Sequence, residues 1–195
     1  MRASTVRPPT EAPDARETEI LRAAELLAHA KVDVIAWNGT SASWLGFDKD
    51  ERLCERITAE TGIAACTSVL AFREIFELVG AKRIGLVTPY RTDVQERIRA
   101  NWGASGFACP AERHMDLQDN FSFATVTETQ IGELVRAVAH ESCDAVAVVC
   151  TNMRGASIAA ALEAVVQRLD VAQAVERRDA PLQFRAIGHA AGQRT

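Results

Sequence analysis

The thiol of Cys150 is the side chain of this 195-residue sequence best suited to catalysis. Residues 145–149 form an apolar run and the small, polar residues 151–155 follow it, which predicts a strand that ends at Cys150 just before a helix. Backbone N–H groups at such a junction favour negative charge and would lower the pKa of a thiol from its ordinary value of about 8.5. The resulting thiolate could pass a proton to or from carbon. The alternative is a buried cysteine with a structural role.

A second group of polar residues occupies the segment NGTSAS at residues 38–43, after the apolar run 32–37. The hydroxyls of Thr40, Ser41 and Ser43, together with backbone amides, could hold a carboxylate. The same donors could stabilise the enediolate that forms when the α-carbon of an acid loses a proton or CO2. The alternative is an ordinary loop rich in serine.

Other polar residues follow further expected strands. Tyr90, the only tyrosine, lies just beyond residues 83–88, and its hydroxyl could donate to the same oxyanion or simply pack. Asn152 and Arg154 could orient a second carboxylate, although a surface position suits Arg154 equally well. The Thr-Ser pair at residues 67–68 is better explained as the cap of the helix that follows it.

The cysteines and histidines do not form a metal site or a disulfide framework. The five cysteines are irregularly spaced without a CxxC pair, and the four histidines do not cluster with them. His29 and His140 are interpreted as structural residues at helix ends, and His114 and Asp116 form no recognisable pair with a nucleophile. There is no GxSxG motif, P-loop or dinucleotide fingerprint. We therefore expect neither a metal nor a cofactor.

Composition excludes several classes of function. The net charge is −4 and no basic stripe is present, so nucleic acid is not an expected partner. No apolar run approaches the roughly 20 residues that span a bilayer, so no membrane association is expected. The first residues lack the apolar segment of a secretory signal and read as a flexible arm. Free thiols fit a reducing compartment, and a cytoplasmic protein is expected.

Hydrophobic periodicity predicts alternating strands and helices. Gly62 and Gly80 should end two of the helices, and capping boxes at Thr92–Gln95 and Thr127–Gln130 should begin two others. This alternation is typical of an α/β fold with parallel sheets. The pattern places helices at residues 17–30, 48–61, 69–79, 92–104, 127–141 and 156–169, and strands at 32–37, 63–66, 83–88, 107–114 and 145–149.

An internal repeat relates the two halves of the chain. Residues 17–40 align without gaps with residues 128–151, and eight of the 24 positions are identical. Gly39 is then the counterpart of Cys150. Two such lobes usually face each other, and the loops after their strands would line a site between them. The alternative is that two unrelated α/β units share generic residues. The strand at 83–88 has no counterpart before the first copy, so the first lobe is expected to lack its opening strand.

Three segments resemble the arylmalonate decarboxylase and maleate isomerase family of the aspartate/glutamate racemase superfamily, and within it the ectoine-utilisation A group. They are WNGTSASWLGFDKDERLC, TSVLAFREIFELVGAKRIGLVTPYRTDVQERI and VVCTNMRGA, and the likeness extends over residues 28–169. The resemblance implies two flavodoxin-like lobes related by a pseudo-twofold axis, with the active site between them. Racemases and maleate isomerases of this group use two facing cysteines, whereas arylmalonate decarboxylase has glycine at the first position. Gly39 and Cys150 follow the one-cysteine pattern.

The same resemblance assigns binding residues. Thr40, Ser41 and Tyr90, with the backbone at Thr151, match the dioxyanion pocket of the family, and Asn152 adjoins them. The family's first strand and its loop are absent here, and the likeness fades beyond residue 170. The expected organisation is an arm at 1–16, an incomplete first lobe at 17–80, a second lobe at 81–170 and a divergent tail at 171–195.

The expected function is that of a cofactor-independent enzyme acting on a small mono- or dicarboxylate, with a place in ectoine catabolism. Cys150 would transfer a proton at the α-carbon, or add to an alkene, in a racemisation, isomerisation or decarboxylation. A single thiol makes strict two-base racemisation the weakest of the three. A homo-oligomer is expected. The alternative is a non-catalytic module that binds a small acid, or an inactive remnant.

Overall fold

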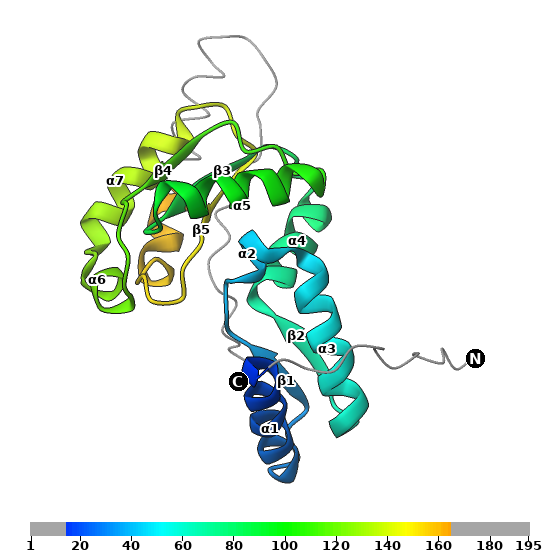
Figure 1. The fold of residues 1–195 in the computed structure, drawn as a ribbon. Helices are drawn as coiled ribbons and strands as arrows, with labels where there is room; N and C mark the ends of the chain where they lie inside the picture. The colour runs from blue at the N-terminus through cyan, green and yellow to red at the C-terminus, as the bar shows by residue number, and fades with distance from the viewer. Residues whose placement is uncertain (1–14, 165–195) are drawn as a thin grey trace. The chain divides into compact units, whose positions relative to one another are not determined.

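The computed structural model describes residues 15–164, which form two compact units (Figure 1). The first unit ends at Ala71 and the second begins at Phe72, so the boundary falls within helix α4 (Ser68–Val79). The sequence pattern places this boundary after Gly80 instead. The tail expected at 171–195 lies outside the described residues, as do most of the arm at 1–16 and the end of the helix expected at 156–169.

The first unit pairs two parallel strands with helices. It contains α1 (Ala15–His29), β1 (Val34–Trp37), α2 (Ala42–Leu45), α3 (Phe47–Thr61) and β2 (Ala64–Thr67), and the described part of its sheet has the order β1-β2. Gly62 adopts the left-handed conformation, with φ of 72°, that ends α3. The two long helices contact each other, and their apolar faces bury a small core with β1, namely Leu21, Ala24, Ile35, Leu53 and Ile57.

The second unit has a three-stranded parallel sheet of order β4-β3-β5 among the described residues. Its elements after α4 are β3 (Ile84–Thr88), α5 (Thr92–Ala104), β4 (Glu112–His114), α6 (Asn120–Thr125), α7 (Glu128–Ala139), β5 (Ala145–Val148) and a 3-10 turn (Ala156–Ile158) that leads into helix. β3 is buried along its whole length, and α7 contacts all three strands (Figure 1). A Cβ on Gly85 would meet the side chain of Val138, so the glycine is what lets α7 approach β3.

An aromatic cluster joins α4 and α5. The ring centroid of Phe76 lies 5.5 Å from those of Trp102 and Phe107, and Phe72 extends the group at 5.9 Å from Phe76 and 6.1 Å from Trp102. Such tilted and edge-on contacts are favoured by the ring quadrupoles. These four residues are buried and form a core separate from the aliphatic one beneath α7.

The repeat in the sequence corresponds to matching elements. Each copy forms a helix followed by a strand, α1 and β1 in the first and α7 and β5 in the second. The strands coincide at the offset of the alignment, because Val34–Trp37 shifted by 111 residues gives Ala145–Val148. The predicted α/β fold with parallel sheets is confirmed.

One of the two predicted capping boxes is confirmed and the other is wrong. The hydroxyl of Thr127 accepts from the backbone N–H of Gln130, and the Gln130 side chain bonds back to the backbone of Thr127. In α5, by contrast, the N-cap is Arg91, without a side-chain cap bond. Gln95 cannot reach back to the helix start because its side chain is buried and bonded elsewhere.

Three other expectations need correction. The strand expected at 107–114 is reduced to an isolated bridge at Ala108 and the strand Glu112–His114, and Pro110 between them has no N–H to donate to a ladder. The loop expected at 38–43 ends early, because α2 begins at Ala42. The short helix α6 was not predicted, although Asp119 caps it by accepting from the N–H of Ser122 at 3.0 Å.

Across residues 15–164, none of the helices combines the length and apolar character that crossing a membrane requires.

Candidate active site

The structure fixes Cys150 at the carboxyl edge of the second unit's sheet. The N–H of Val149 donates to the carbonyl of Val87 at 2.9 Å, so the last sheet hydrogen bond immediately precedes the cysteine. The Cys150 carbonyl then accepts from the N–H of Met153 at 3.2 Å, which closes a turn. Met153 is buried, whereas Cys150 is half-buried against the aliphatic core. The thiol therefore sits on a well-anchored backbone and keeps access to solvent.

Tyr90 emerges from the same edge as Cys150. It follows β3, which pairs in parallel with β5 in a register that joins Val87 to Val148. The Tyr90 side chain is 8% exposed, and its ring packs edge-on against Phe123 of α6 at 5.5 Å between centroids. The carboxyl ends of neighbouring parallel strands are where α/β proteins bind ligands. The position of Tyr90 therefore suits both of the proposed roles, packing and contact with a ligand.

Thr151 and Asn152 belong to the exposed loop after Cys150. The hydroxyl of Thr151 donates to the side-chain carbonyl of Asn152 at 3.4 Å, and the Asn152 amide donates to the carbonyl of Asn120 at 3.4 Å. Asn120 begins α6, so this helix supports the cysteine loop.

In the first unit, Gly39, Thr40 and Ser41 follow β1 at the corresponding edge. The preceding residue, Asn38, accepts a hydrogen bond from the hydroxyl of Ser68 at 2.7 Å, which ties the loop after β1 to the start of α4. Ser41 is the N-cap of α2, yet its side chain makes no cap bond, so capping does not occupy its hydroxyl. The sequence reasoning missed Asn38, whose place at a strand end was the available signal.

Two other candidates, Ser43 and Thr67, are buried. Ser43 is fully buried within α2 and so does not belong to an exposed binding loop. Thr67 is 1% exposed, and its hydroxyl accepts from the N–H of Leu70 at 3.1 Å, as expected for a helix cap. Thr67 also hydrogen-bonds the buried Asp50, where it opposes the rise in pKa that burial imposes on that carboxyl.

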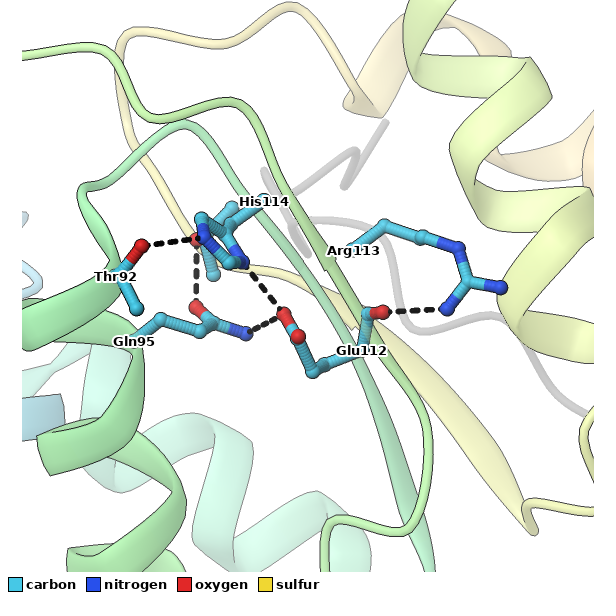
Figure 2. A network of polar contacts seen from close by, with 6 residues as sticks. Thr92, Gln95, Glu112, Arg113 and His114 are labelled. Carbon is cyan, nitrogen blue, oxygen red and sulfur yellow. Dashed lines mark hydrogen bonds and ion pairs between the residues drawn. The ribbon is translucent and has the colours of Figure 1, made fainter.

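A polar network in the second unit connects β3, β4 and α5 (Figure 2). The two ring nitrogens of His114 contact Thr92 Oγ1 at 3.1 Å and Glu112 Oε2 at 2.9 Å. The same Glu112 oxygen accepts from the Gln95 amide at 2.9 Å, and Gln95 in turn accepts from the hydroxyl of Thr88 at 2.7 Å. Sequence reasoning found no partner for His114. The signal was its spacing of two from Glu112, which puts both on one face of a strand.

This network lies next to the backbone that carries Tyr90. Beyond β4, the N–H of Asp116 donates to the carbonyl of Tyr90 at 3.2 Å, and that of Leu117 donates to the carbonyl of Pro89 at 2.9 Å. The segments after β3 and after β4 are therefore fastened together directly beyond the network. The network thus braces the two strands, β3 and β4, whose ends carry these segments.

The other cysteines differ from Cys150 in their surroundings. Burial, with a smaller effect from the charge of Asp50, raises the pKa of Cys54 to about 11. Burial raises the pKa of Cys109 to about 12, against a weaker opposing effect of Arg99. Cys143 is buried and donates to the carbonyl of Val138 at 3.7 Å. A thiol that is both buried and protonated is a poor nucleophile.

Within the part of the chain that the structure describes, no group of three or more His, Cys, Asp or Glu side chains could hold a metal ion.

A shallow hollow of about 540 Å3 also lies in the second unit. Met115, Leu117, Ser122, Gln130 and Glu133 are among the residues that line it. Its walls include none of the residues predicted to bind substrate.

The sequence matches the model of one protein family, arylmalonate decarboxylase, over residues 10–176. A maleate isomerase of Pseudomonas putida is 28% identical over 157 residues, which make up 77% of this chain and 63% of that protein. The chain thus spans less than two thirds of the length of this curated relative.

Solved structures share the fold. A crystal structure of arylmalonate decarboxylase matches with a TM-score of 0.71 and 20% identity, over 90% of this chain and 71% of that one. A Nocardia farcinica maleate cis-trans isomerase, a cysteine-to-serine mutant with a covalently bound succinylcysteine intermediate, matches with a TM-score of 0.70 and 20% identity over 76% of this chain and 64% of that one. The family match covers most of the sequence, and the chain belongs to the arylmalonate decarboxylase family.

Proposed function

We propose that this protein is a cofactor-independent isomerase or decarboxylase that acts on a small mono- or dicarboxylate, with Cys150 as its single acid/base thiol. The observation that carries the proposal is the position of Cys150, half-buried at the carboxyl edge of β5 on an anchored backbone. Membership of the arylmalonate decarboxylase family supports the class of reaction. The covalent succinylcysteine of the Nocardia relative supports a cysteine as the reacting group.

Two reaction courses suit one thiol. In a decarboxylation, the bond to the departing CO2 breaks and its electron pair remains on the substrate as an enediolate. The Cys150 thiol then gives its proton to the α-carbon, and the thiolate regains a proton from water. In an isomerisation, the Cys150 thiolate adds to one alkene carbon, and the π electron pair moves onto the adjacent carboxylate as an enediolate. The former carbon–carbon double bond, now single, rotates. The electron pair then returns to restore the double bond as the thiolate leaves. Neither course requires a redox partner.

We assign the binding of the carboxylate and enediolate to Gly39, Thr40, Ser41, Tyr90, Thr151 and Asn152. Each unit carries its share of these residues at the carboxyl edge of its own sheet, which supports the assignment. Hydroxyl and backbone donors aimed at a developing oxyanion are the usual source of stabilisation for such an intermediate. The hydroxyl of Ser41 is not used as a helix cap, which leaves it suited to this role.

A screen with small acids tests the proposal. Maleate and phenylmalonate are the first candidates, and turnover is followed by NMR in D2O. Iodoacetamide labelling with peptide mapping then shows whether a turned-over acid protects Cys150 but not the exposed Cys66. Protection of Cys150 together with turnover supports the enzyme. Protection without turnover of any acid would favour the alternative, a binding module, and labelling of Cys150 that no acid affects would contradict both.

The finer assignments rest on the sequence resemblance to the ectoine-utilisation A group. We propose a cytoplasmic homo-oligomer that takes part in ectoine catabolism. Deleting the gene should impair growth of its host on ectoine, and the wild-type gene should restore growth where the Cys150→Ser gene does not. Light scattering of the purified protein tests the oligomer, and a monomeric mass would contradict it.

A further inference from the structure

Gly39 is a glycine for reasons of space rather than backbone conformation. Its φ lies outside the left-handed region that favours glycine, unlike those of Gly62 and Gly80. A Cβ added there would lie 2.6 and 2.9 Å from Cε2 and Cζ2 of the Trp37 indole, and closer still to Nε1. Contacts under 3 Å require one group to move. The indole is a rigid ring, so it would have to shift as a whole.

The indole of Trp37 is not free to shift without cost. Trp37 is the last residue of β1, where it pairs with Thr67 of β2. Its half-buried side chain packs against the apolar core of the first unit, which includes Ile35 and Leu53. Moving it would uncover part of that core, and burial of a large aromatic side chain is among the main stabilising contributions in a small core.

The repeat shows what occupies these positions in the second unit. At the offset of 111 residues, Trp37 corresponds to Val148 and Gly39 to Cys150. The second unit thus combines a medium-sized residue with a thiol, and the first combines a large residue with no side chain at all.

We propose that Trp37 determines the one-thiol character of this protein, because its indole fills the space that a side chain at residue 39 would need. This inference rests on the proposed function of Cys150. The indole N–H is a donor only and does not titrate in the physiological range, so it cannot replace a second acid/base. Trp37 therefore excludes two-thiol racemisation and leaves the reactions that need one thiol.

The steric part of the proposal is tested by thermal unfolding. Gly39→Ala should lower Tm by several degrees, whereas Gly103→Ala should not, because a Cβ there meets nothing within 4 Å in α5. Trp37→Val should lower Tm by removing packing. Trp37→Val/Gly39→Ala should lose clearly less than the sum of the two single losses, since the smaller residue makes room for the methyl. Trp37→Phe/Gly39→Ala serves the same purpose if the valine variant does not fold. Additive losses, or a Gly39→Ala Tm equal to that of wild type, would overturn the proposal.

The functional part uses a thiol at the same site. With phenylmalonate in D2O, the α-deuterated product that Gly39→Cys forms, whatever its rate, should have the single configuration of the wild-type product, and Trp37→Val/Gly39→Cys should form both configurations. Racemic product from Gly39→Cys with Trp37 in place would overturn the inference, as would product of one configuration from the double variant. The unfolding series does not depend on Cys150. It therefore still decides the role of Trp37 if Cys150→Ser shows the proposed function to be wrong.

Discussion

Single residues set the chemistry of this protein through what surrounds them. Five cysteines share one side-chain type, but Cys109 and Cys143 are buried, Cys54 and Cys150 are half-buried, and Cys66 is exposed. Burial disfavours a thiolate at Cys54 and Cys109, and the charge of Asp50 adds to this effect at Cys54. Cys150 lies at a strand end with access to solvent. This accessibility, together with the position of Cys150 just after β5, is the reason that we propose Cys150 as the reacting group.

The raised pKa of Cys109 predicts an alkaline loss of stability. An unfolded thiol titrates near pH 9, and the folded Cys109 only at about 12. The folded-state pKa is the higher one, so the contribution to stability is fully present below pH 9 and is lost as the pH rises towards 12. The urea midpoint of wild type should therefore fall between pH 8.5 and 10.5 by more than that of Cys109→Ala. Parallel curves for the two proteins would contradict the assignment.

The raised pKa of Asp50 predicts a loss of stability in the same direction, with rising pH, but in the acidic range. Burial raises its carboxyl pKa above the ordinary 3.8, against the opposing hydrogen bond from Thr67. A raised folded pKa means that the stabilising contribution exists below the unfolded pKa and is lost as the pH rises through the folded one. Asp50→Asn should therefore raise the urea midpoint at pH 7 and change it less at pH 3. An equal effect at both pH values would show that the charge of Asp50 is not what matters.

At the scale of elements, the contact of α7 with the sheet organises the second unit. α7 begins with the capping box of Thr127 and Gln130 and presents Ile131, Val135 and Val138 to the aliphatic core. β5, which ends next to Cys150, lies under the same helix. Any change that lifts α7 from the sheet would thus also loosen the backbone that holds the thiol.

A substitution at Gly85 tests the close contact between α7 and β3. Gly85→Ala should destabilise the protein by about 1–3 kcal/mol, because the new methyl meets Val138 and lies 3.1 Å from the Cys143 sulfur. Chemical unfolding followed by circular dichroism measures the loss. Val138→Ala in the same chain should recover part of it by removing the obstructing methyls. If Gly85→Ala unfolds like wild type, α7 does not pack on β3 as closely as described.

The capping box gives a second test at this scale. Thr127→Ala should cost about 1 kcal/mol, since the first turn of α7 loses its side-chain acceptor. Gln130→Ala removes the reciprocal bond, and the double variant should lose less than the sum because the two side chains act together. Strict additivity of these losses would argue against a reciprocal cap.

Local signals in the sequence predict elements better than they predict the partners of side chains. The Thr127 and Thr92 motifs are alike in sequence, yet only the first forms a capping box. The second fails because Thr88 and Glu112, seven and 17 residues from Gln95, take its side chain into a buried network. The spacing within one helix contains no information on those distant partners. α6 was missed for a related reason, since a six-residue helix has too few turns to show periodicity.

At the scale of the whole molecule, duplication explains why the candidate residues occur in two sets. The sequence repeat predicts the equivalence of β1 and β5, and the strand positions match it. It also pairs Gly39 with Cys150. What the repeat could not show is why the first position is a glycine, because that depends on how the Trp37 ring lies in the folded unit. The binding roles of the two loops stay a prediction.

The proposed isomerase or decarboxylase activity depends most directly on the thiol of Cys150. The decisive measurement is the turnover number of Cys150→Ser against that of Cys66→Ser, on whichever of maleate or phenylmalonate the wild type converts. Cys66 is exposed and is not part of the proposed site, so its variant controls for the loss of a thiol as such. We predict that Cys150→Ser loses a factor of about 100 or more, as expected when an acid/base is removed, while Cys66→Ser stays near wild type. Wild-type turnover by Cys150→Ser would contradict the account.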